Sequence, residues 1–403
     1  MKRDEKWLIS VTTGRWQRHG IREARAIGLK VLGIDTDPDA EGFADVDHKL
    51  NISFDDHNKI IRALRELDLN ICGAVSFCSE VGMMLAARIR EEFDLPGARP
   101  DLCIKLLDKA LQRQIWTAKG VPGPEWKIFG DPQATLAGIH QFKLPLIIKP
   151  TDSSGSRGVT KIESLDDDLT DAVNRAFQFS KSCKVIVESY MDGTEFTVEV
   201  FVADGDVHVL AVTEKKKVEG TKGTVASELA TPDRPEEIVT AIKNCVVDAF
   251  RALDYTEGPG HAEVILMKDD SVGLVEVAGR GGGFMVFNGL VPAVSGVNIA
   301  QLTALQAVGF PVGPIECKKD AAVLRFFPST PGVLIGISGF EKANQIPGVE
   351  SAPFVQVGAH FQRATADGDR LGYILSRATT PGKAQELANE AEKFVFFDIK
   401  NTQ

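Results

Sequence analysis

Two glutamates lie in apolar runs on either side of a polar turn, and together they could hold a metal ion. If the turn is centred between Asp269 and Asp270, Glu263 stands directly opposite Glu276. Opposed like charges are unfavourable on a sheet, so a cation is expected between them. Carboxylate ligands favour Mg²⁺, with Mn²⁺ as the alternative. If the turn is offset by one residue, the two glutamates would be unrelated and would face solvent.

The same hairpin predicts which side chains share a face with the two acids. Side chains alternate faces along a strand, so His261 lies beside Glu263, and Arg280 lies beyond Glu276 on the same face. Three glycines, Gly281–Gly283, follow Arg280. The pattern therefore predicts a face on which carboxylates and a cation meet.

A loop of small residues separates the strand-like runs Leu146–Lys149 and Gly158–Ile162. Its candidate anion-binding residues are Ser153, Ser154, Gly155 and Ser156. Small residues let backbone N–H groups approach a phosphate closely. No Gly-Lys-Ser/Thr sequence enters a helix here, so the loop is not a Walker A motif. We expect it to join two strands and cover phosphates as a flap, and the alternative is an ordinary Gly/Ser turn.

Two further carboxylates lie around a glycine turn. Glu188 ends the apolar run that begins at Val185, and Glu195 follows Gly193. Ribose hydroxyls favour a carboxylate acceptor, and adenine needs an acceptor for its amine together with backbone hydrogen bonds. The segment therefore predicts a nucleoside site. The alternative, favoured for each glutamate taken singly, is an exposed residue without a ligand.

The longest basic run is Lys215–Lys217, close to Glu214 and Glu219. Mixed charges of this kind are typical of a solvated hairpin or loop, which is the favoured interpretation. The alternative is a mobile loop that reaches nucleotide phosphates.

The elements that position these residues change along the chain. Short apolar runs such as Trp7–Val11 and Val31–Ile34 alternate with helical patterns, which predicts strand–helix–strand units on a parallel sheet. A helix carrying Leu106 and Ile115 follows, with a domain boundary near residue 115.

From Leu144 onward, strands with tight turns such as Ala203–Asp206 predict antiparallel sheet flanked by helices. After about residue 310, a smaller α/β lobe is expected. Its strands are Ala321–Phe327 and Gly372–Ser376, and its helix is Gly382–Lys393.

Composition excludes several classes of protein. The chain has 403 residues and a formal net charge of -10, which argues against nonspecific nucleic-acid binding. The charged N-terminal stretch lacks the apolar length of a signal peptide or membrane span, so a cytoplasmic protein without membrane attachment is expected. Six cysteines without a CxxC pair predict buried, reduced thiols rather than zinc ligands or disulfides.

Five motifs, in this order and spacing, resemble the ATP-grasp superfamily. They are Lys109 in LLDK, Gly120–Pro124, the IIKP segment with its Gly-rich loop, VESYMDGTE, and HAEVI followed by LVEVAGRGGG. Within the superfamily the chain looks closest to carboxylate–amine ligases of the L-amino-acid ligase type, which form dipeptides. The resemblance implies an α/β and α+β fold over nearly the whole chain. Residues 1–115 would form an open parallel α/β domain, residues 116–310 two antiparallel nucleotide-binding lobes, and residues 311–403 a C-terminal α/β lobe that completes the ATP-grasp region.

The resemblance also implies roles for single residues. Lys109 and Lys149 would contact the phosphates and the adenine edge, Glu188, Tyr190 and Met191 would form the adenine hinge, and Glu195 would bind ribose. Glu263 and Glu276 would bind magnesium, Arg280 would face the transferred phosphoryl group, and Glu228 would hold the amine. The alternative for Glu228 is an exposed loop residue. Two positions depart from the family pattern: Ala278 replaces an asparagine, and Thr231 replaces a histidine after Glu228.

The implied activity is ATP-dependent joining of a carboxylate, activated as an acyl phosphate, to an amine, with release of ADP and phosphate. Small-molecule substrates, amino acids above all, are expected, and homodimers are common among relatives. Alternatives are a carboxylase or purine-biosynthesis type of ligase with another acid and nucleophile, and a non-catalytic nucleotide-binding protein. A nicotinamide oxidoreductase would use Asp35 for ribose, but Thr12–Gly14 has one glycine where that fingerprint needs three.

Overall fold

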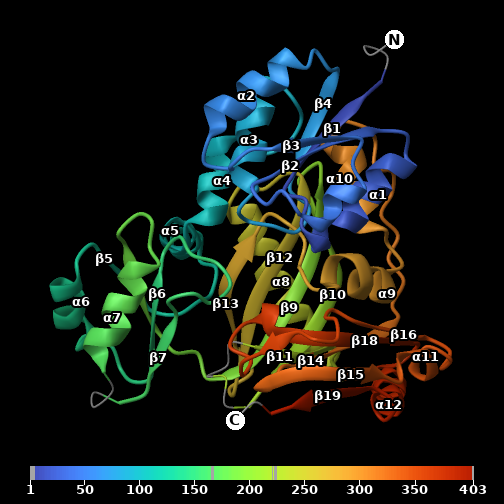
Figure 1. Ribbon diagram of the computed structural model, residues 1–403. Coiled ribbons are helices and arrows are strands. Elements are labelled where there is room, and N and C mark those ends of the chain that lie inside the picture. The colour runs from blue at the N-terminus through green and yellow to red at the C-terminus, as the bar shows by residue number, and fades with distance from the viewer. Residues whose placement is uncertain (1–4, 165–167, 220, 222–224, 402–403) are drawn as a thin grey trace.

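The N-terminal unit is an open sheet of four parallel strands in the order β3-β2-β1-β4. The computed structural model describes residues 5–164, 168–219, 221 and 225–401, and this unit lies at the top of Figure 1. The elements are β1 (Trp7–Val11), β2 (Lys30–Asp35), β3 (His48–Asn51), β4 (Ile71–Val75), α1 (Arg18–Ala26), α2 (His57–Glu66), α3 (Met83–Glu92) and the 3-10 turns η1 (Arg15–Gln17) and η2 (Glu41–Ala44). β1 is buried along its whole length, as expected for a parallel strand covered on both faces.

Asp35, the residue that an oxidoreductase would use for ribose, has a structural contact here. Its Oδ2 accepts a hydrogen bond of 2.6 Å from the backbone N–H of Thr13. The carboxylate therefore stabilises the turn that follows β1.

Two helices, α4 (Pro100–Leu107) and α5 (Lys109–Lys119), replace the single helix expected around Leu106 to Ile115. The expectation missed the break at Asp108. The carboxylate of Asp108 accepts hydrogen bonds from the backbone of Ala110 at 2.8 Å and of Leu111 at 3.3 Å, which caps the start of α5. Lys109 is consequently the first residue of α5, and residue 115 lies within that helix.

A small lobe follows, to the left of the central sheet in Figure 1. Its antiparallel strands have the order β5-β8-β6-β7. The elements are β5 (Trp126–Phe129), α6 (Pro132–Ile139), β6 (Leu146–Pro150), β7 (Thr160–Ile162), α7 (Leu169–Gln178) and β8 (Val185–Ser189). The Gly/Ser loop joins β6 to β7, as predicted.

The largest sheet has eight antiparallel strands in the order β13-β12-β9-β10-β11-β14-β18-β16. These are β9 (Gly193–Ala203), β10 (Asp206–Lys217), β11 (Ala226–Ala230), β12 (Gly258–Met267), β13 (Val272–Ala278), β14 (Ala321–Pro328), β16 (Val349–Pro353) and β18 (Arg370–Ala378). The accompanying helices are α8 (Glu236–Ala252), the π-helical turn η3 (Val286–Leu290), α9 (Val291–Ser295), α10 (Ile299–Ala307), α11 (Phe340–Ala343), the 3-10 turn η4 (Asp367–Asp369) and α12 (Pro381–Glu392).

The C-terminal region is more closely joined to this sheet than a separate lobe would be. The strands and the helix expected after residue 310 are present as β14, β18 and α12. However, β14, β16 and β18 extend the large sheet, because β14 pairs with β11. Only β15 (Gly332–Ser338), β17 (His360–Phe361) and β19 (Phe396–Lys400) form a sheet of their own.

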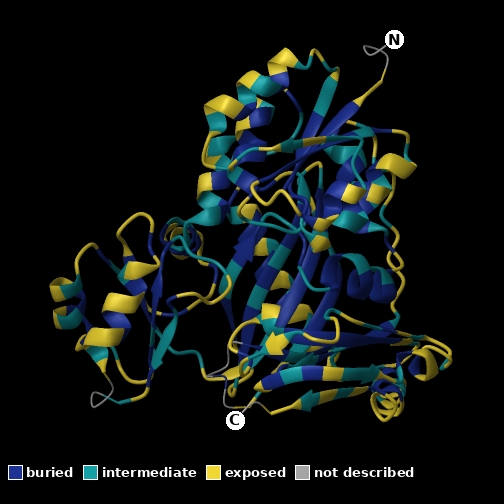
Figure 2. Ribbon diagram, in the orientation of Figure 1, coloured by how far each residue is buried: buried dark blue, intermediate teal, exposed yellow. Residues whose placement is uncertain are grey.

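One hydrophobic core links the N-terminal unit to the large sheet. Ile21 of α1 belongs to the same buried cluster as Phe201 of β9 and Phe287 of η3. Figure 2 shows buried residues concentrated on the strands of the large sheet, whereas the outer faces of α6 and α7 are exposed. The N-terminal unit therefore packs directly on the sheet that carries the candidate site.

The cysteines only partly match the expectation of buried thiols. All six are free, but only Cys103 and Cys245 are buried, and Cys183 and Cys317 are exposed. As to membranes, the described residues contain no single helix that is both long and apolar enough to cross one. Only the bent pair Val286–Ser295 and Ile299–Ala307 passes such a test, by length and composition alone.

Candidate active site

The predicted pairing of the two acids is confirmed, although by a different route. Glu263 on β12 pairs with Glu276 on β13, but the next pairs toward the turn are Val264 with Leu274 and Ile265 with Gly273. The turn is thus offset by one residue from the assumed centre. A β-bulge at Val275 adds one residue to β13 and restores the alignment. The alternative of unrelated glutamates is wrong, because the bulge compensates for the offset.

Two lysines lie against the acid pair. Lys215 Nζ lies 2.5 Å from an oxygen of Glu263 and 2.5 Å from an oxygen of Glu195. Lys109 Nζ lies 3.0 Å from Oε2 of Glu276 and donates to the carbonyl of Ser153 at 2.9 Å. We call these five side chains, Lys109, Glu195, Lys215, Glu263 and Glu276, the acid-pair cluster. It brings the predicted ribose acid, both metal acids and the Gly/Ser loop together.

The interpretation of Lys215–Lys217 as a solvated hairpin or loop is wrong for Lys215, whereas Lys216 and Lys217 are exposed. Lys215 lies in β10 with its side chain largely buried, and Lys217 also contacts Glu195. Burial alone lowers the pKa of Lys215, but Glu195 and Glu263 outweigh burial and raise it well above its usual value. Sequence reasoning missed this because β10 extends beyond its apolar run, and charged residues at a strand end resemble a loop.

The fit of the acid pair to a divalent cation follows from its donors. Glu263 and Glu276 offer only oxygen atoms, and the described residues hold no group of three or more His, Cys, Asp or Glu side chains suited to a metal. Mg²⁺ keeps several waters and commonly binds through one or two carboxylates plus substrate phosphates. The acid pair fits such an ion, and Lys109 and Lys215 contribute further positive charge beside it.

A histidine connects the acid pair to the three glycines that follow Arg280. His261 Nδ1 lies 2.5 Å from Glu199 Oε1, and the other oxygen of Glu199 accepts a hydrogen bond of 3.1 Å from the backbone of Gly282. Burial lowers the pKa of His261, but Glu199 and Glu263 raise it overall to about 9. The imidazolium therefore lies between two carboxylates at neutral pH. Its alternation with Glu263 was the only sequence signal.

Arg280 lies beyond Glu276, and its partner comes from the N-terminal unit. Its Nη2 donates to Glu80 at 2.6 Å, and its Nη1 donates to the carbonyl of Gly281 at 3.0 Å. The backbone N–H of Gly281 in turn donates to the carbonyl of Phe77 at 2.9 Å. Glu80 was missed in the sequence, where nothing distinguishes it from an exposed loop residue. The N-terminal unit thus contributes directly to the candidate site.

A second set of charges is fully engaged with itself. Glu188 lies 2.8 Å from Arg113 Nε and 2.8 Å from Lys149 Nζ, one contact at each carboxylate oxygen. We call Arg113, Lys149 and Glu188 the inner cluster. Burial raises the pKa of Glu188, but Arg113 and Lys149 lower it overall to about 2. The predicted adenine acceptor is therefore already paired with two cations.

The other hinge residues lie beside this cluster. The backbone N–H of Tyr190 donates to the carbonyl of Pro145 at 3.1 Å, and the tyrosine ring lies under Lys161 Nζ at 4.1 Å from its centroid. Met191 packs close to Gly273 of β13. The hinge segment thus touches both the small lobe and the acid-bearing hairpin.

Glu228 is not brought together with the other predicted residues. It is buried on β11, where Arg325 lies 2.5 Å away and Lys216 2.7 Å away, so the exposed-loop interpretation is wrong. Lys216 follows Lys215 on β10, and consecutive residues of a strand point to opposite faces. Glu228 therefore lies on the opposite face of the sheet from the acid pair.

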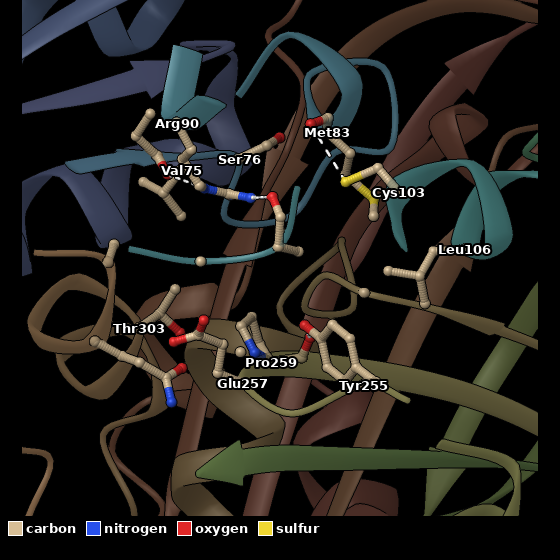
Figure 3. Close-up of a pocket in the computed structure, with 17 residues that line it drawn as sticks. Val75, Ser76, Met83, Arg90, Cys103, Leu106, Tyr255, Glu257, Pro259 and Thr303 are labelled. Atoms are coloured by element: carbon tan, nitrogen blue, oxygen red, sulfur yellow. Dashed lines mark hydrogen bonds between the residues drawn. The ribbon is translucent and has the colours of Figure 1, made fainter. Parts of the chain in front are cut away.

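A separate cavity of about 50 Å³ lies at the seam between the N-terminal unit and the large sheet (Figure 3). Arg90 lines one side, and Tyr255, Glu257 and Pro259 line the other. Arg90 donates to the carbonyls of Ala74 at 2.9 Å and Ala98 at 2.6 Å. Gly279, the residue before Arg280, lines this cavity, whereas none of the acid-pair cluster does.

Two family models match the chain: one of an ATP-grasp domain matches residues 142–288, and one of L-amino acid ligase C-terminal domain 2 matches residues 325–400. Alanine–anticapsin ligase from Bacillus subtilis is 26% identical over 294 residues, covering 65% of this chain and 61% of the relative. A protein of Sinorhizobium fredii is 26% identical over 336 residues, covering 81% of this chain and 67% of the relative.

Among solved structures, L-amino acid ligase from Bacillus licheniformis has a similar fold, with a TM-score of 0.84 and 23% identity over the full length of both chains. Across the curated relatives, the matched segments span about half to two thirds of the relatives' length. These comparisons agree with the expected α/β and α+β architecture.

Proposed function

The chain is an ATP-grasp protein with an L-amino acid ligase C-terminal domain, and on this premise we propose that it joins a carboxylate to an amine, using ATP and releasing ADP and phosphate. The single observation that carries the proposal is the acid-pair cluster. Two carboxylates face each other across the β12–β13 hairpin, and Lys109 and Lys215 approach them from other elements. This arrangement suits the polyphosphate of ATP and its metal ion better than it suits a neutral ligand.

Phosphate binding would fall to the lysines and the Gly/Ser loop. Lys109 already touches the loop at Ser153 and the acid pair at Glu276, so it can pass from carboxylate to phosphate with little movement. Lys215 can do the same from Glu263. Glu195, beside Lys215, is available to accept a ribose hydroxyl. The hinge at Tyr190 and Met191 and the neighbouring Lys149 would border the adenine.

The reaction has two steps that balance in atoms and charge. A carboxylate oxygen of the acid attacks the γ-phosphorus, and the bond to the oxygen of ADP breaks, which forms an acyl phosphate. The neutral amine then attacks the acyl carbon, phosphate leaves, and the amine loses one proton. Mg²⁺ held by Glu263 and Glu276 would supply positive charge to the phosphate oxygens.

Arg280 would act where negative charge accumulates. Glu80 and the carbonyl of Gly281 hold two of its N–H groups, which fixes the plane of the guanidinium and leaves other donors of the fork for an oxyanion. A preorganised, permanently charged donor stabilises the transferring phosphoryl group and the acyl-phosphate oxygens more than the ground state. Arg280 is therefore assigned the catalytic role, and Glu228 is not included.

Amino acids are the proposed substrates. The C-terminal domain match and the similarity to an alanine–anticapsin ligase support an amino acid as the carboxylate donor and another as the amine. The histidine of the family pattern is Thr231 here, whose hydroxyl oxygen accepts a hydrogen bond of 3.0 Å from the backbone N–H of Ala322 on β14. The amine partner would consequently differ from that of the relatives.

The test is a product analysis with labelled substrate. The purified protein would be incubated with Mg²⁺, ATP and amino acids, singly and in pairs, with ¹⁸O in the carboxyl group of one acid. We expect ADP and phosphate only when a carboxylate is present, and one ¹⁸O atom in the released phosphate. AMP and pyrophosphate, or phosphate without label, would contradict the acyl-phosphate route. ATP binding with no carboxylate-dependent turnover would favour the non-catalytic alternative.

A further inference from the structure

Arg113 of α5 joins Glu188 of the inner cluster to the edge of the large sheet. Its Nε bonds to Glu188, its Nη1 donates to the carbonyl of Leu274 at 3.0 Å, and its Nη2 donates to the carbonyl of Val275 at 2.7 Å. The side chain is only 4% exposed. All three nitrogens of one guanidinium are therefore engaged, two of them by consecutive carbonyls of β13.

Those two carbonyls mark the β-bulge. Val275 is the extra residue that shifts β13 by one position, so that Glu276 rather than its neighbour pairs with Glu263. A bulge leaves backbone groups without ladder partners, and they need other donors. Without the extra residue, the register would turn Glu276 to the other face of the sheet. The bulge thus decides whether the acid pair exists.

The outer edge of β13 has no strand neighbour in the described part of the chain, because β13 ends the order of the sheet. Side chains and backbone from α5 and the segment after it cover this edge. Gln112 donates to the carbonyl of Val277 at 2.9 Å, and the backbone N–H of Leu274 donates to the carbonyl of Pro122 at 2.9 Å. Arg113 supplies the charged part of this cover, at the position of the bulge.

Resting on the proposed function, we propose that Arg113 is a positioning residue for the metal-binding carboxylate of Glu276. The guanidinium fixes the bulge that sets the register of β13, and Glu188 fixes the guanidinium. Through Glu188, Arg113 therefore connects Lys149, which would border the adenine, to the strand that carries Glu276. A lysine at this position has one point charge and cannot bond two carbonyls and a carboxylate in one plane.

The test measures metal affinity rather than turnover. Mn²⁺ binding to the protein saturated with ADP would be followed by the electron paramagnetic resonance of free Mn²⁺, and ADP affinity would be measured separately with metal chelated. Outer contacts of metal ligands typically contribute 10–100-fold in affinity, so Arg113→Lys should raise the Kd for Mn²⁺ about tenfold or more. The reading is independent of ligase activity.

Arg90→Lys is the matched control. Arg90 is also an arginine that donates to two backbone carbonyls, but at the seam cavity (Figure 3). It should lower the melting temperature and leave the Kd for Mn²⁺ within about twofold, since it touches no part of β13. If Arg113→Lys weakens Mn²⁺ no more than Arg90→Lys at equal loss of melting temperature, the proposal is overturned.

A second variant covers the case in which Arg113→Lys does not fold. The inner cluster has two cations and one carboxylate, so Arg113→Gln leaves a one-to-one pair of Lys149 and Glu188. It should raise the Kd for Mn²⁺ in the same way. In a Glu276→Gln background it should add nothing, because Arg113 acts through Glu276. Full additivity there would overturn the proposal.

The outcomes also separate this proposal from the proposed function. If the wild-type protein shows no carboxylate-dependent release of ADP but the Mn²⁺ series behaves as expected, the reaction is wrong and the role of Arg113 stands. If the wild-type protein is a ligase and the Arg113 variants bind Mn²⁺ normally, the reaction stands and the role of Arg113 is wrong.

Discussion

The inner cluster and the acid-pair cluster have similar side chains but differ in their exposure to solvent. In the inner cluster, Arg113, Glu188 and Lys149 are 4%, 5% and 6% exposed. In the acid-pair cluster, Glu263 is 22% exposed and Glu276 28%. A buried charge must keep its partner, because losing it leaves an uncompensated ion away from water. A partly exposed charge can exchange its partner for a ligand.

This difference separates two tasks that similar ion pairs can perform. The inner cluster fixes relative positions, since Arg113 and Lys149 hold one carboxylate and Arg113 also holds β13. The acid-pair cluster keeps two lysines against carboxylates that would otherwise repel each other. We expect mutations in the first cluster to lower stability and to weaken ligand binding, and mutations in the second to lower turnover with a smaller loss of stability.

The largest expected effect is that of Glu276→Gln. The amide keeps the shape of the side chain but removes the negative charge that would hold the metal ion, whose contribution to catalysis is several kcal/mol. We expect kcat to fall by roughly a thousandfold and the melting temperature to change by only a few degrees. Steady-state assay of ADP release and differential scanning calorimetry would measure both. Retention of full activity would assign Glu276 to the surface instead.

Arg280→Ala should come next. Loss of one preorganised donor costs about 3 kcal/mol, so kcat should fall roughly a hundredfold or more while the affinity for ATP changes little. Arg280→Lys should recover little activity, because a flexible ammonium cannot replace the planar fork. The measurement is kcat together with the ATP dissociation constant. Weakened ATP binding with normal kcat at saturation would make Arg280 a ground-state contact.

A matched pair of lysine variants compares the two clusters directly. Lys149→Met leaves Glu188 buried with one partner fewer, so stability should fall by about 1–3 kcal/mol and ATP should bind more weakly. Lys215→Met removes a cation from the more exposed cluster, so kcat should fall while stability changes less. Thermal unfolding and steady-state kinetics on both variants provide the comparison. Equal losses of stability would remove the distinction between the clusters.

The smallest expected effect is on the pH dependence of stability. The pKa of His261 is raised to about 9 in the folded protein. Its contribution to the free energy of unfolding is therefore complete below about pH 6.5 and is lost as the pH rises through about 9. The pKa of Glu188 is lowered to about 2, so its contribution is present above about pH 4.5 and is lost as the pH falls toward 2.

Unfolding by denaturant between pH 6.5 and 9.5 would test the alkaline side of this expectation. Over that range, the free energy of unfolding of the wild-type protein should fall by on the order of 2 kcal/mol more than that of His261→Gln. If the free energy of unfolding depends on pH in the same way in both proteins, His261 is not held as an imidazolium.

The sequence by itself determined the order of the elements and the identity of the two acids. Period-two alternation and a polar turn are local properties, so a hairpin that brings Glu263 close to Glu276 could be predicted from the sequence. Their direct pairing also depends on the bulge, which compensates for the offset of the turn. The strand–loop–strand character of the Gly/Ser segment was equally local. The bulge at Val275 was not predicted, because nothing in a run of apolar residues marks which one loses its partner.

Only the tertiary structure decided which charges meet. Lys215 belongs to β10, Glu80 to the N-terminal unit and Arg113 to a helix outside the sheet, and each contacts a residue far from it in sequence. Glu228 is the opposite case: its motif made it a candidate, but the fold places it away from the site. It contacts Lys216, whose side chain points to the opposite face of the sheet from that of Lys215, which contacts Glu263. A charged residue has the same local pattern whether water or a buried partner neutralises it, so its role depends on chain segments that only the fold brings together.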